Sequence, residues 1–453
     1  MDEAFSINMA SNSISHIIET YGNDVHPPFY YVLLHFVMLF GNSEFMVRMP
    51  SAIFGILTIP LLYITGKKFF TFREGLISAF LLSISYYHIY YSQEARMYTL
   101  LTFSFLASFY CFYRACEHKN NLIFFIGYIL FTLMSIYTHY FGFFILPITI
   151  LYILTSKVLF KKITLDIKSL HRMLLSCIVI TVSVIPLVLI FFNQINNKVG
   201  GEVAWGTSPA NLFIKLLVRF STLAPSTSLL FSLLFVLGAL ISLKNNKNQF
   251  ILMGIWFALP IVVSYYLASI MPFETRYLII LLPAFLLFIA RGITGTTEYL
   301  FPIRQEKRIK STTGNVENNR NVFIILILLL FSLVSYGPLH EYYSDNLKPD
   351  WRDAASFLEH NTNDGDVVIP LPGSETGAMA YYYDNSSYGT YIEVIPGTID
   401  ALEDIIATNR TYTVWIVMST DIQVVDPGGE VVRWLVNNAN LEKTDPMILI
   451  FSA

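Results

Sequence analysis

This sequence has little charge, few cysteines and no basic tract of the kind that binds nucleic acid. Only 13% of its 453 residues are Asp, Glu, Lys or Arg, whereas a soluble domain carries about 25%. Its three cysteines have neither a metal-binding spacing nor an obvious disulfide role. The composition therefore argues against a soluble domain, a nucleic-acid partner and a cysteine-based metal site.

Hydrophobic residues make up 54% of the chain and aromatic residues 15%. They form long apolar runs with the charged residues between them, which is typical of a polytopic α-helical membrane protein. Windows of about 20 apolar residues predict about ten spans. These lie near 46–66, 73–91, 97–116, 121–137, 140–157, 173–192, 226–243, 249–270, 276–294 and 322–339. The apolar stretch 27–41 is too short to span and predicts a re-entrant or interfacial helix that starts at Pro28.

Lysine and arginine are concentrated in alternate loops. The rich loops lie at 67–73, 114–119, 157–172, 244–247 and 304–320. The positive-inside rule makes these loops cytoplasmic. The poor segments are then external, namely residues 1–45, 92–96, 138–140, 193–225 and 271–276 and everything after about 340. We expect a multi-pass protein of a bacterial or archaeal plasma membrane.

The charge map and the composition predict three regions. Residues 1–45 form a first external loop with juxtamembrane helices, 46–339 form the helical membrane domain, and 340–453 form an external α/β domain. In the last region helical and strand patterns alternate. Helices are predicted at 351–360, 375–383, 399–407 and 430–437, and strands at 366–371, 391–395, 411–418 and 446–451.

Three polar clusters interrupt the apolar sequence, and all of them fall on the predicted external face. They are Asp2-Glu3, the segment from Asp24 to Pro28, and the segment from Ser92 to Tyr98, which includes Glu94 and Arg96. Charged residues at membrane depth are costly, so such clusters are typical of functional sites. Simpler interpretations stay open: a solvated terminus for the first, a helix entry for the second and a surface ion pair for the third.

Two further pairs lie in external turns. An arginine there can bind phosphate through its two-pronged guanidinium group, which makes Arg276-Tyr277 a second candidate after Arg96. Interfacial snorkelling of the arginine is the alternative. His139-Tyr140 occupies another external turn, where a lone histidine is more often an interfacial residue than a ligand.

Together these residues suit group transfer from a lipid phosphate. A carboxylate would deprotonate an acceptor hydroxyl while arginines stabilise the departing phosphate. Direct displacement with one base would invert the anomeric carbon of a transferred sugar. A transporter or lipid flippase without transferase activity is the competing hypothesis. The position of the polar residues at the outer ends of spans, rather than at mid-membrane, favours the enzyme.

The order of these motifs resembles the membrane glycosyltransferases of the GT-C class. The branch it resembles contains protein O-mannosyltransferases and the bacterial lipid A aminoarabinose transferase. The motifs are Asp2-Glu3-Ala4, Asp24 with His26-Pro27-Pro28-Phe29-Tyr30-Tyr31, Ser92-Gln93-Glu94-Ala95-Arg96-Met97-Tyr98, Tyr137-Thr138-His139-Tyr140-Phe141-Gly142, Arg276-Tyr277-Leu278 and Asp350-Trp351-Arg352-Asp353.

The resemblance implies a polyprenyl-phosphate-linked sugar as donor and a protein, lipid or glycan as acceptor, with membrane lipids around both. It implies that Asp2 is the catalytic base, with Glu3 as the second acidic residue and Asp24 as a further loop carboxylate. Arg96 and Arg276 would hold the donor phosphate. No cofactor is implied with certainty, and use of a divalent metal stays open. The family has a transmembrane helix before its acidic pair, so we expect that such a helix is missing here.

Overall fold

The computed structural model divides into two compact units. One is Ala10–Pro338, and the other combines Met1–Met9 with Leu339–Ala453. The described residues are 2–20, 26–117, 122–160, 167–198, 207–221, 225–271, 273–302, 310–345, 348–383, 399–409, 411–420, 422, 426, 428–445 and 447–453.

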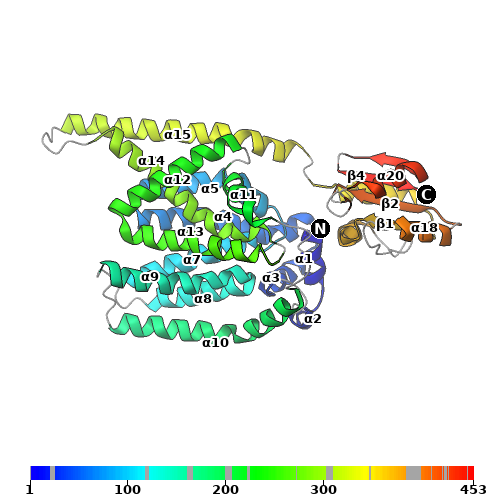
Figure 1. The fold of residues 1–453 in the computed structure, drawn as a ribbon, viewed down its shortest axis with the longest axis horizontal. Helices are drawn as coiled ribbons and strands as arrows, with labels where there is room; N and C mark the ends of the chain where they lie inside the picture. The colour runs from blue at the N-terminus through cyan, green and yellow to red at the C-terminus, as the bar shows by residue number, and fades with distance from the viewer. Residues whose placement is uncertain are drawn as a thin grey trace. The chain divides into compact units, whose positions relative to one another are not determined.

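The unit Ala10–Pro338 is helical, and its longer helices run side by side (Figure 1). Its α-helices are α2 (Ile14–Thr20), α3 (Phe29–Met38), α4 (Glu44–Phe69), α5 (Phe72–Ser83), α6 (Tyr86–Ser92), α7 (Tyr98–Glu117), α8 (Leu122–Thr138), α9 (Ile145–Phe160), α10 (Ile167–Lys198), α11 (Pro209–Phe220), α12 (Pro225–Asn245), α13 (Lys247–Leu267) and α14 (Leu282–Leu300). Two 3₁₀ helices, η2 (Tyr140–Phe144) and η3 (Thr275–Leu281), precede α9 and α14. Helices α1 (Asp2–Ser11) and α15 (Lys310–Ser344) each cross a boundary between the units.

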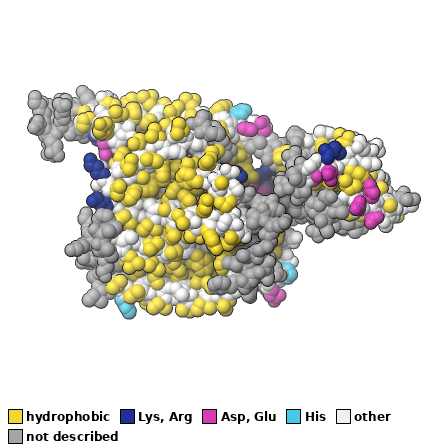
Figure 2. Space-filling view, in the orientation of Figure 1, with side chains coloured by type: hydrophobic (Ala, Val, Ile, Leu, Met, Phe, Trp, Pro, Cys, Tyr) yellow, Lys and Arg dark blue, Asp and Glu magenta, His cyan; other side chains and the backbone are white. Residues whose placement is uncertain are grey.

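Six helices of the described chain are long and apolar enough to cross a membrane. They lie at Glu44–Phe69, Lys168–Phe191, Thr227–Asn245, Lys247–Leu267, Thr275–Leu300 and Val316–Ser344. Hydrophobic side chains cover much of the visible face of the helical unit (Figure 2), which suits contact with lipid tails. The polytopic helical class is therefore confirmed, whereas the count of about ten spans stays a prediction.

Helix α14 lies at the centre of the helical unit, because the apolar window of Thr275–Leu300 is buried along its whole length. It packs closely on α12 through glycines. A Cβ atom on Gly238 would lie 1.8 Å from the carbonyl oxygen of Phe288, and one on Gly292 would lie 2.1 Å from that of Leu234. Small residues allow membrane helices to approach this closely.

The predicted span 73–91 is not one continuous helix, and as a span it stays a prediction. Helix α5 ends at Ser83, and α6 begins after Ser85, whose backbone is extended and whose hydroxyl accepts from the backbone N–H of His88. A serine cap of this kind starts a new helix. The predicted short helix near 27–41 is observed as α3, with Pro28 as its N-cap.

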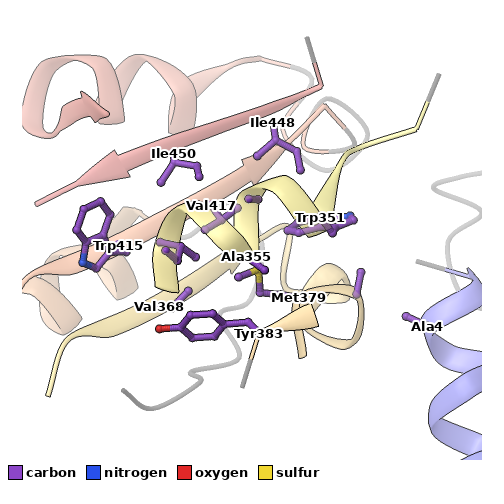
Figure 3. Packing of buried hydrophobic residues seen from close by; sticks show 13 residues of the cluster. Ala4, Trp351, Ala355, Val368, Met379, Tyr383, Trp415, Val417, Ile448 and Ile450 are labelled. Atoms are coloured by element: carbon purple, nitrogen blue, oxygen red, sulfur yellow. The ribbon is translucent and has the colours of Figure 1, made fainter. Parts of the chain in front are cut away.

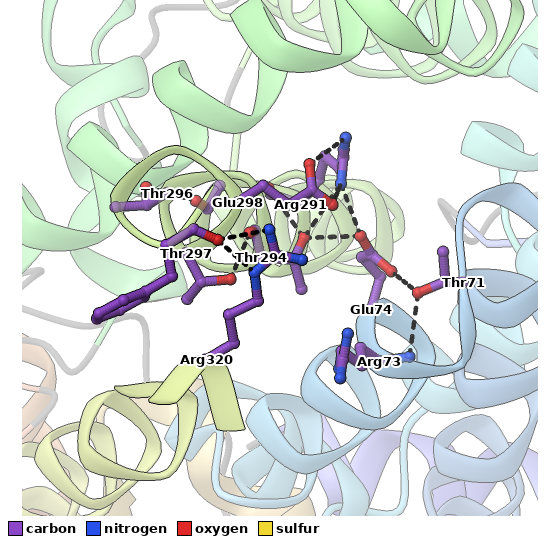
Figure 4. A network of polar contacts seen from close by, with 11 residues as sticks. Thr71, Arg73, Glu74, Arg291, Thr294, Thr296, Thr297, Glu298 and Arg320 are labelled. Atoms are coloured by element: carbon purple, nitrogen blue, oxygen red, sulfur yellow. Dashed lines mark hydrogen bonds and ion pairs between the residues drawn. The ribbon is translucent and has the colours of Figure 1, made fainter. Parts of the chain in front are cut away.

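A buried polar network joins α5 to α14 (Figure 4). Glu74 is 1% exposed, and its carboxylate accepts from Arg291 Nη1 at 3.0 Å and from Thr294 Oγ1 at 2.6 Å. The hydroxyl of Thr71 donates to its other oxygen. Arg291 also donates from both terminal nitrogens to Glu298, at 3.1 and 3.2 Å. The charges are thus matched and hydrogen-bonded, as burial requires.

The second unit is built around a four-stranded sheet in the order β1-β2-β4-β3. The strands are β1 (Val367–Leu371), β2 (Val414–Ser419), β3 (Asn440–Thr444) and β4 (Ile448–Ser452). The pair β1–β2 is parallel, and β4 runs antiparallel to both β2 and β3. The helices are α16 (Trp351–Asn361), α17 (Thr376–Tyr382), α18 (Ile399–Thr408) and α20 (Glu430–Asn438), and a 3₁₀ turn η4 (Gly373–Glu375) precedes α17.

Helices pack on both faces of this sheet, and every residue of β1 and β2 is therefore buried. On one face, Trp351, Ala355 and Met379 pack against Val417 and strand residues around it (Figure 3). On the other face, residues of α18 and α20 such as Leu402 and Leu435 pack against Ile369, Ile416 and Phe451.

The alternating pattern predicted for this unit is confirmed where the structure describes it, by α16, β1, α17, α18, β2, α20 and β4. The predicted strand 391–395 lies outside the described residues. Strand β3 was missed because its sequence Asn-Leu-Glu-Lys-Thr is mostly exposed and has no apolar face.

Asp366, just before β1, ties the two parallel strands together. Its carboxylate accepts from the backbone N–H of Asn363 and Thr413, both at 2.9 Å, and from Trp415 Nε1 at 3.2 Å. We expect Asp366→Ala to destabilise this unit by about 2–4 kcal/mol, because the buried indole N–H of Trp415 and two partly buried backbone N–H groups lose their acceptor. Hydrogen exchange of the β1 and β2 amides in the full chain measures this loss. The exposed neighbour Asp364→Ala is the control, and equal protection in both variants would contradict the prediction.

Candidate functional site

Four predicted site segments lie at ends of helices in the unit Ala10–Pro338. His26 lies before α3, the turn containing Arg96 joins α6 to α7, His139 joins α8 to η2, and Arg276 lies in η3. His26, Arg96 and His139 are 5%, 3% and 4% exposed. Their positions at helix ends in a buried setting set them apart from a solvated surface.

Helices α3 and α4 fix the turn that carries Arg96. Within the turn, the backbone N–H of Arg96 donates to the carbonyl of Glu94 at 2.7 Å. Ser51 of α4 donates its hydroxyl to the carbonyl of Arg96 at 2.8 Å, and that same hydroxyl lies 2.9 Å from the hydroxyl of Tyr30. The carbonyl of Ser51 in turn accepts from Thr99 Oγ1 at 2.8 Å. The turn is therefore held by side chains from three helices.

The two histidines and Tyr277 form one aromatic cluster. The ring centroids of His26 and His139 lie 5.2 Å apart, and those of His139 and Tyr277 also lie 5.2 Å apart. The rings of His26 and Tyr277 are separated by 6.3 Å. Segments that are far apart in the sequence are thus brought together, as the site hypothesis requires.

Both candidate phosphate-binding arginines lie against the same ring, that of Tyr98. The guanidinium carbon of Arg96 is 5.9 Å from its centroid and that of Arg276 is 6.0 Å away. The Tyr98 ring also lies 6.3 Å from that of His139. Two positive charges therefore lie close to the histidine cluster, and such an arrangement attracts an anion.

The pKa of His139 is lowered by burial and by this excess of positive charge. Burial lowers the pKa of His139 well below its usual value, and the charges of His26, Arg96 and Arg276 lower it further. Desolvation and like charges both disfavour the imidazolium form. The ring is consequently neutral at physiological pH.

The remaining predicted site residues have different placements. Glu94 is buried in the turn, near enough to Tyr91 for its charge to act on the phenol. Tyr140 packs its ring on Phe191 of α10, at 4.6 Å. Asp24 lies outside the described residues.

Asp2 and Glu3 belong to the other unit, on α1. A carboxylate oxygen of Glu3 lies 3.8 Å from the amine of Lys348. The side chain of Asp2 lies outside the described residues. The catalytic roles of both residues stay predictions.

Sequence reasoning missed the central role of Tyr98, which contacts both arginines and His139. Its place two residues after Arg96, in a segment rich in tyrosine, was the available signal. Arg219 of α11 was noted only as part of a long loop, yet it lies close enough to Tyr87 for its charge to act on the phenol. The ring of Tyr87 lies 4.9 Å from that of Tyr91, which in turn lies 4.9 Å from Tyr98.

Among the described residues, no three histidine, cysteine, aspartate or glutamate side chains gather in a geometry that could hold a metal ion. The two imidazoles of the cluster lie close to two guanidinium groups, whose charge opposes a cation there.

Comparison with known proteins agrees with this architecture. Residues 25–186 match the family described as dolichyl-phosphate-mannose-protein mannosyltransferase. Apo ArnT from Cupriavidus metallidurans superposes with a TM-score of 0.59 at 11% identity, covering 99% of this chain and 93% of ArnT. The resemblance to the GT-C glycosyltransferases is confirmed.

Other solved structures share the GT-C fold. ArnT bound to undecaprenyl phosphate gives a TM-score of 0.56 at 11% identity and covers 100% of this chain and 93% of its own. The Archaeoglobus fulgidus oligosaccharyltransferase tethered to an acceptor peptide gives 0.56 at 12% identity, covering 93% of this chain and 65% of that enzyme. No curated protein sequence matches the chain. At these identities the structural likeness establishes the fold alone.

Proposed function

We propose that this protein is an inverting glycosyltransferase that moves a sugar from a polyprenyl-phosphate donor to an acceptor on the external face of the membrane. The observation that carries the proposal is that the guanidinium groups of Arg96 and Arg276 both lie about 6 Å from the centroid of one buried ring, that of Tyr98. A GT-C fold and a neighbour bound to undecaprenyl phosphate support the same donor class.

The charge of the site fits the charge of the donor. A sugar joined to polyprenyl phosphate is a phosphodiester with one negative charge, and the departing polyprenyl phosphate gains a second. Two guanidinium groups, Arg96 and Arg276, match this dianion and so stabilise the leaving group more than the bound donor. Arginine is suited to this role because its fork binds two phosphate oxygens.

Asp2 supplies the base in this proposal. Its carboxylate takes the proton from an acceptor hydroxyl, whose oxygen attacks the anomeric carbon as the bond to the phosphate oxygen breaks. The electron pair of that bond leaves with the phosphate, so no covalent enzyme intermediate forms and the configuration inverts. Glu3 is the second acidic residue of the pair, and Asp24 and His26 would bind the donor.

The low lysine and arginine content of the loops that carry these residues supports an external reaction face. In a bacterium or archaeon this is the outer side of the plasma membrane. The unit that includes Leu339–Ala453 would then also be external and would contribute to recognition of a protein, lipid or glycan acceptor. The transferred sugar is a hexose or a pentose.

We expect Asp2→Asn to lower transfer at least about 10³-fold, because an amide cannot accept the acceptor proton. Membranes that contain the full chain are supplied with polyprenyl phosphate carrying a radiolabelled hexose, and labelled product is counted. Glu19→Gln, an exposed change on α2, is the matched acidic control. Full transfer by Asp2→Asn would rule out Asp2 as the base.

A further inference from the structure

The imidazole of His139 is fixed in one tautomer by its own turn. Its Nδ1 atom accepts a hydrogen bond from the backbone N–H of Phe141, at 3.1 Å, and caps η2. Because an amide N–H can only donate, Nδ1 carries no proton. The single proton of the neutral ring therefore lies on Nε2.

The surroundings of His139 oppose a second proton. Protonation at Nδ1 would break the bond from Phe141 and set two N–H groups against each other. The groups that face the ring come from every neighbouring segment: His26 before α3, Arg96 in the α6–α7 turn, Tyr98 of α7, and Arg276 and Tyr277 of η3. They supply positive charge and aromatic rings, and burial at 4% exposure withholds water from a cation.

The Nε2–H group of His139 is available to a ligand. No described residue accepts a hydrogen bond from it, although the backbone N–H of Phe141 satisfies the other nitrogen. This donor, on a side chain that is 4% exposed, lies beside two arginines that both contact Tyr98. The group therefore faces the part of the site where positive charge would hold an anion.

We propose that His139 binds the donor phosphate as a neutral hydrogen-bond donor through Nε2–H and keeps this proton throughout the reaction. This inference rests on the proposed function. Arg96 and Arg276 already supply the two positive charges that a departing phosphate monoester dianion needs. A neutral donor adds a directed hydrogen bond without a third charge, which would hold the product more tightly and slow its release.

Binding of undecaprenyl phosphate to the purified full-length protein tests this role. His139→Phe keeps a ring but removes both nitrogens, and His139→Gln keeps an N–H at a similar reach. We expect His139→Phe to lose about 10-fold in affinity, the size of one hydrogen bond to a charged group, and His139→Gln to stay within about 3-fold of wild type. His35→Gln on α3, whose ring bonds the carbonyl of Ala10, is the control.

The pH dependence separates a neutral donor from a titrating one. The phosphate probe itself titrates, so the informative quantity is the ratio of the wild-type affinity to that of His139→Phe. We expect this ratio to be constant from about pH 5.5 to about pH 8.5. A ratio that rises as the pH falls would show that an imidazolium forms, and it would overturn the proposal.

Two failures remain distinguishable in this experiment. If wild-type protein and His139→Phe bind undecaprenyl phosphate equally tightly, the result contradicts the His139 inference alone. Wild-type protein that binds no undecaprenyl phosphate contradicts the proposed function, and the ligand assigned to His139 falls with it.

Discussion

Replacing Arg96 or Arg276 by alanine should lower sugar transfer by about 10²–10³-fold each, the usual effect of removing one group that stabilises a developing oxyanion. Arg96 is 3% exposed, and both guanidinium groups lie about 6 Å from the centroid of the Tyr98 ring. If both hold one phosphate, their effects are coupled. The double variant should therefore lose less than the product of the single losses.

The measurement is kcat/KM for transfer of a labelled sugar from polyprenyl phosphate. Arg48→Ala is the matched control, because Arg48 forms a partly exposed ion pair with Glu44 within α4. Arg96→Lys should restore only part of the activity, since an ammonium group keeps the charge but lacks the guanidinium fork. If Arg96→Ala transfers sugar with the same kcat/KM as Arg48→Ala, Arg96 does not bind the donor phosphate.

How far the sequence could predict this site depends on the kind of signal each residue leaves. Arg96, His139 and Arg276 stand in short polar turns between apolar runs, so their cost at membrane depth identifies them. Their convergence on one face follows from the loop charges. The pairing of both arginines with Tyr98 does not, because tyrosine is common at membrane interfaces and position alone does not single out Tyr98 among the tyrosines of its segment.

The fold shows the same division. Strands β1 and β2 were predicted because they are continuous apolar runs. Strand β3 was missed because it owes its structure to the free edge of β4 rather than to its own residues. The break between α5 and α6 was missed as well, because a single serine cap inside an apolar run does not alter its mean hydropathy.

Arg291 is a further example. It lies inside the predicted span 276–294, where a lone charge indicates a buried partner or a function. That partner, Glu74, lies 217 residues earlier in the chain, and no local pattern connects the two. The structure therefore supplies the explanation, which is a polar contact between α5 and α14.

This contact predicts the largest loss of stability in the helical unit. Arg291→Met should leave the Glu74 carboxylate buried without a cation and should cost about 3–5 kcal/mol, because an uncompensated charge then remains in a site of low polarity. Glu74→Gln should cost less, because Arg291 keeps its two bonds to the Glu298 carboxylate. The Arg291 and Glu74 side chains are only 8% and 1% exposed, so solvent cannot screen either charge.

The double variant Glu74→Gln/Arg291→Met decides whether the charges or the shapes matter. It removes both charges together, so we expect it to be much closer to wild type than Arg291→Met alone. Thermal unfolding of the detergent-solubilised full chain gives all three values. Arg73→Ala is the control, because Arg73 pairs with Glu317 at a partly exposed position, where an ion pair contributes less than about 1 kcal/mol. Single variants as stable as this control would show that the buried pair does not hold α5 against α14.

If the expected loss is found, the Glu74–Arg291 pair fixes α14, which directly follows η3, and η3 carries Arg276. The position of Arg276, the arginine proposed to bind phosphate before the start of α14, would then depend on a neutralised charge pair near the middle of that helix.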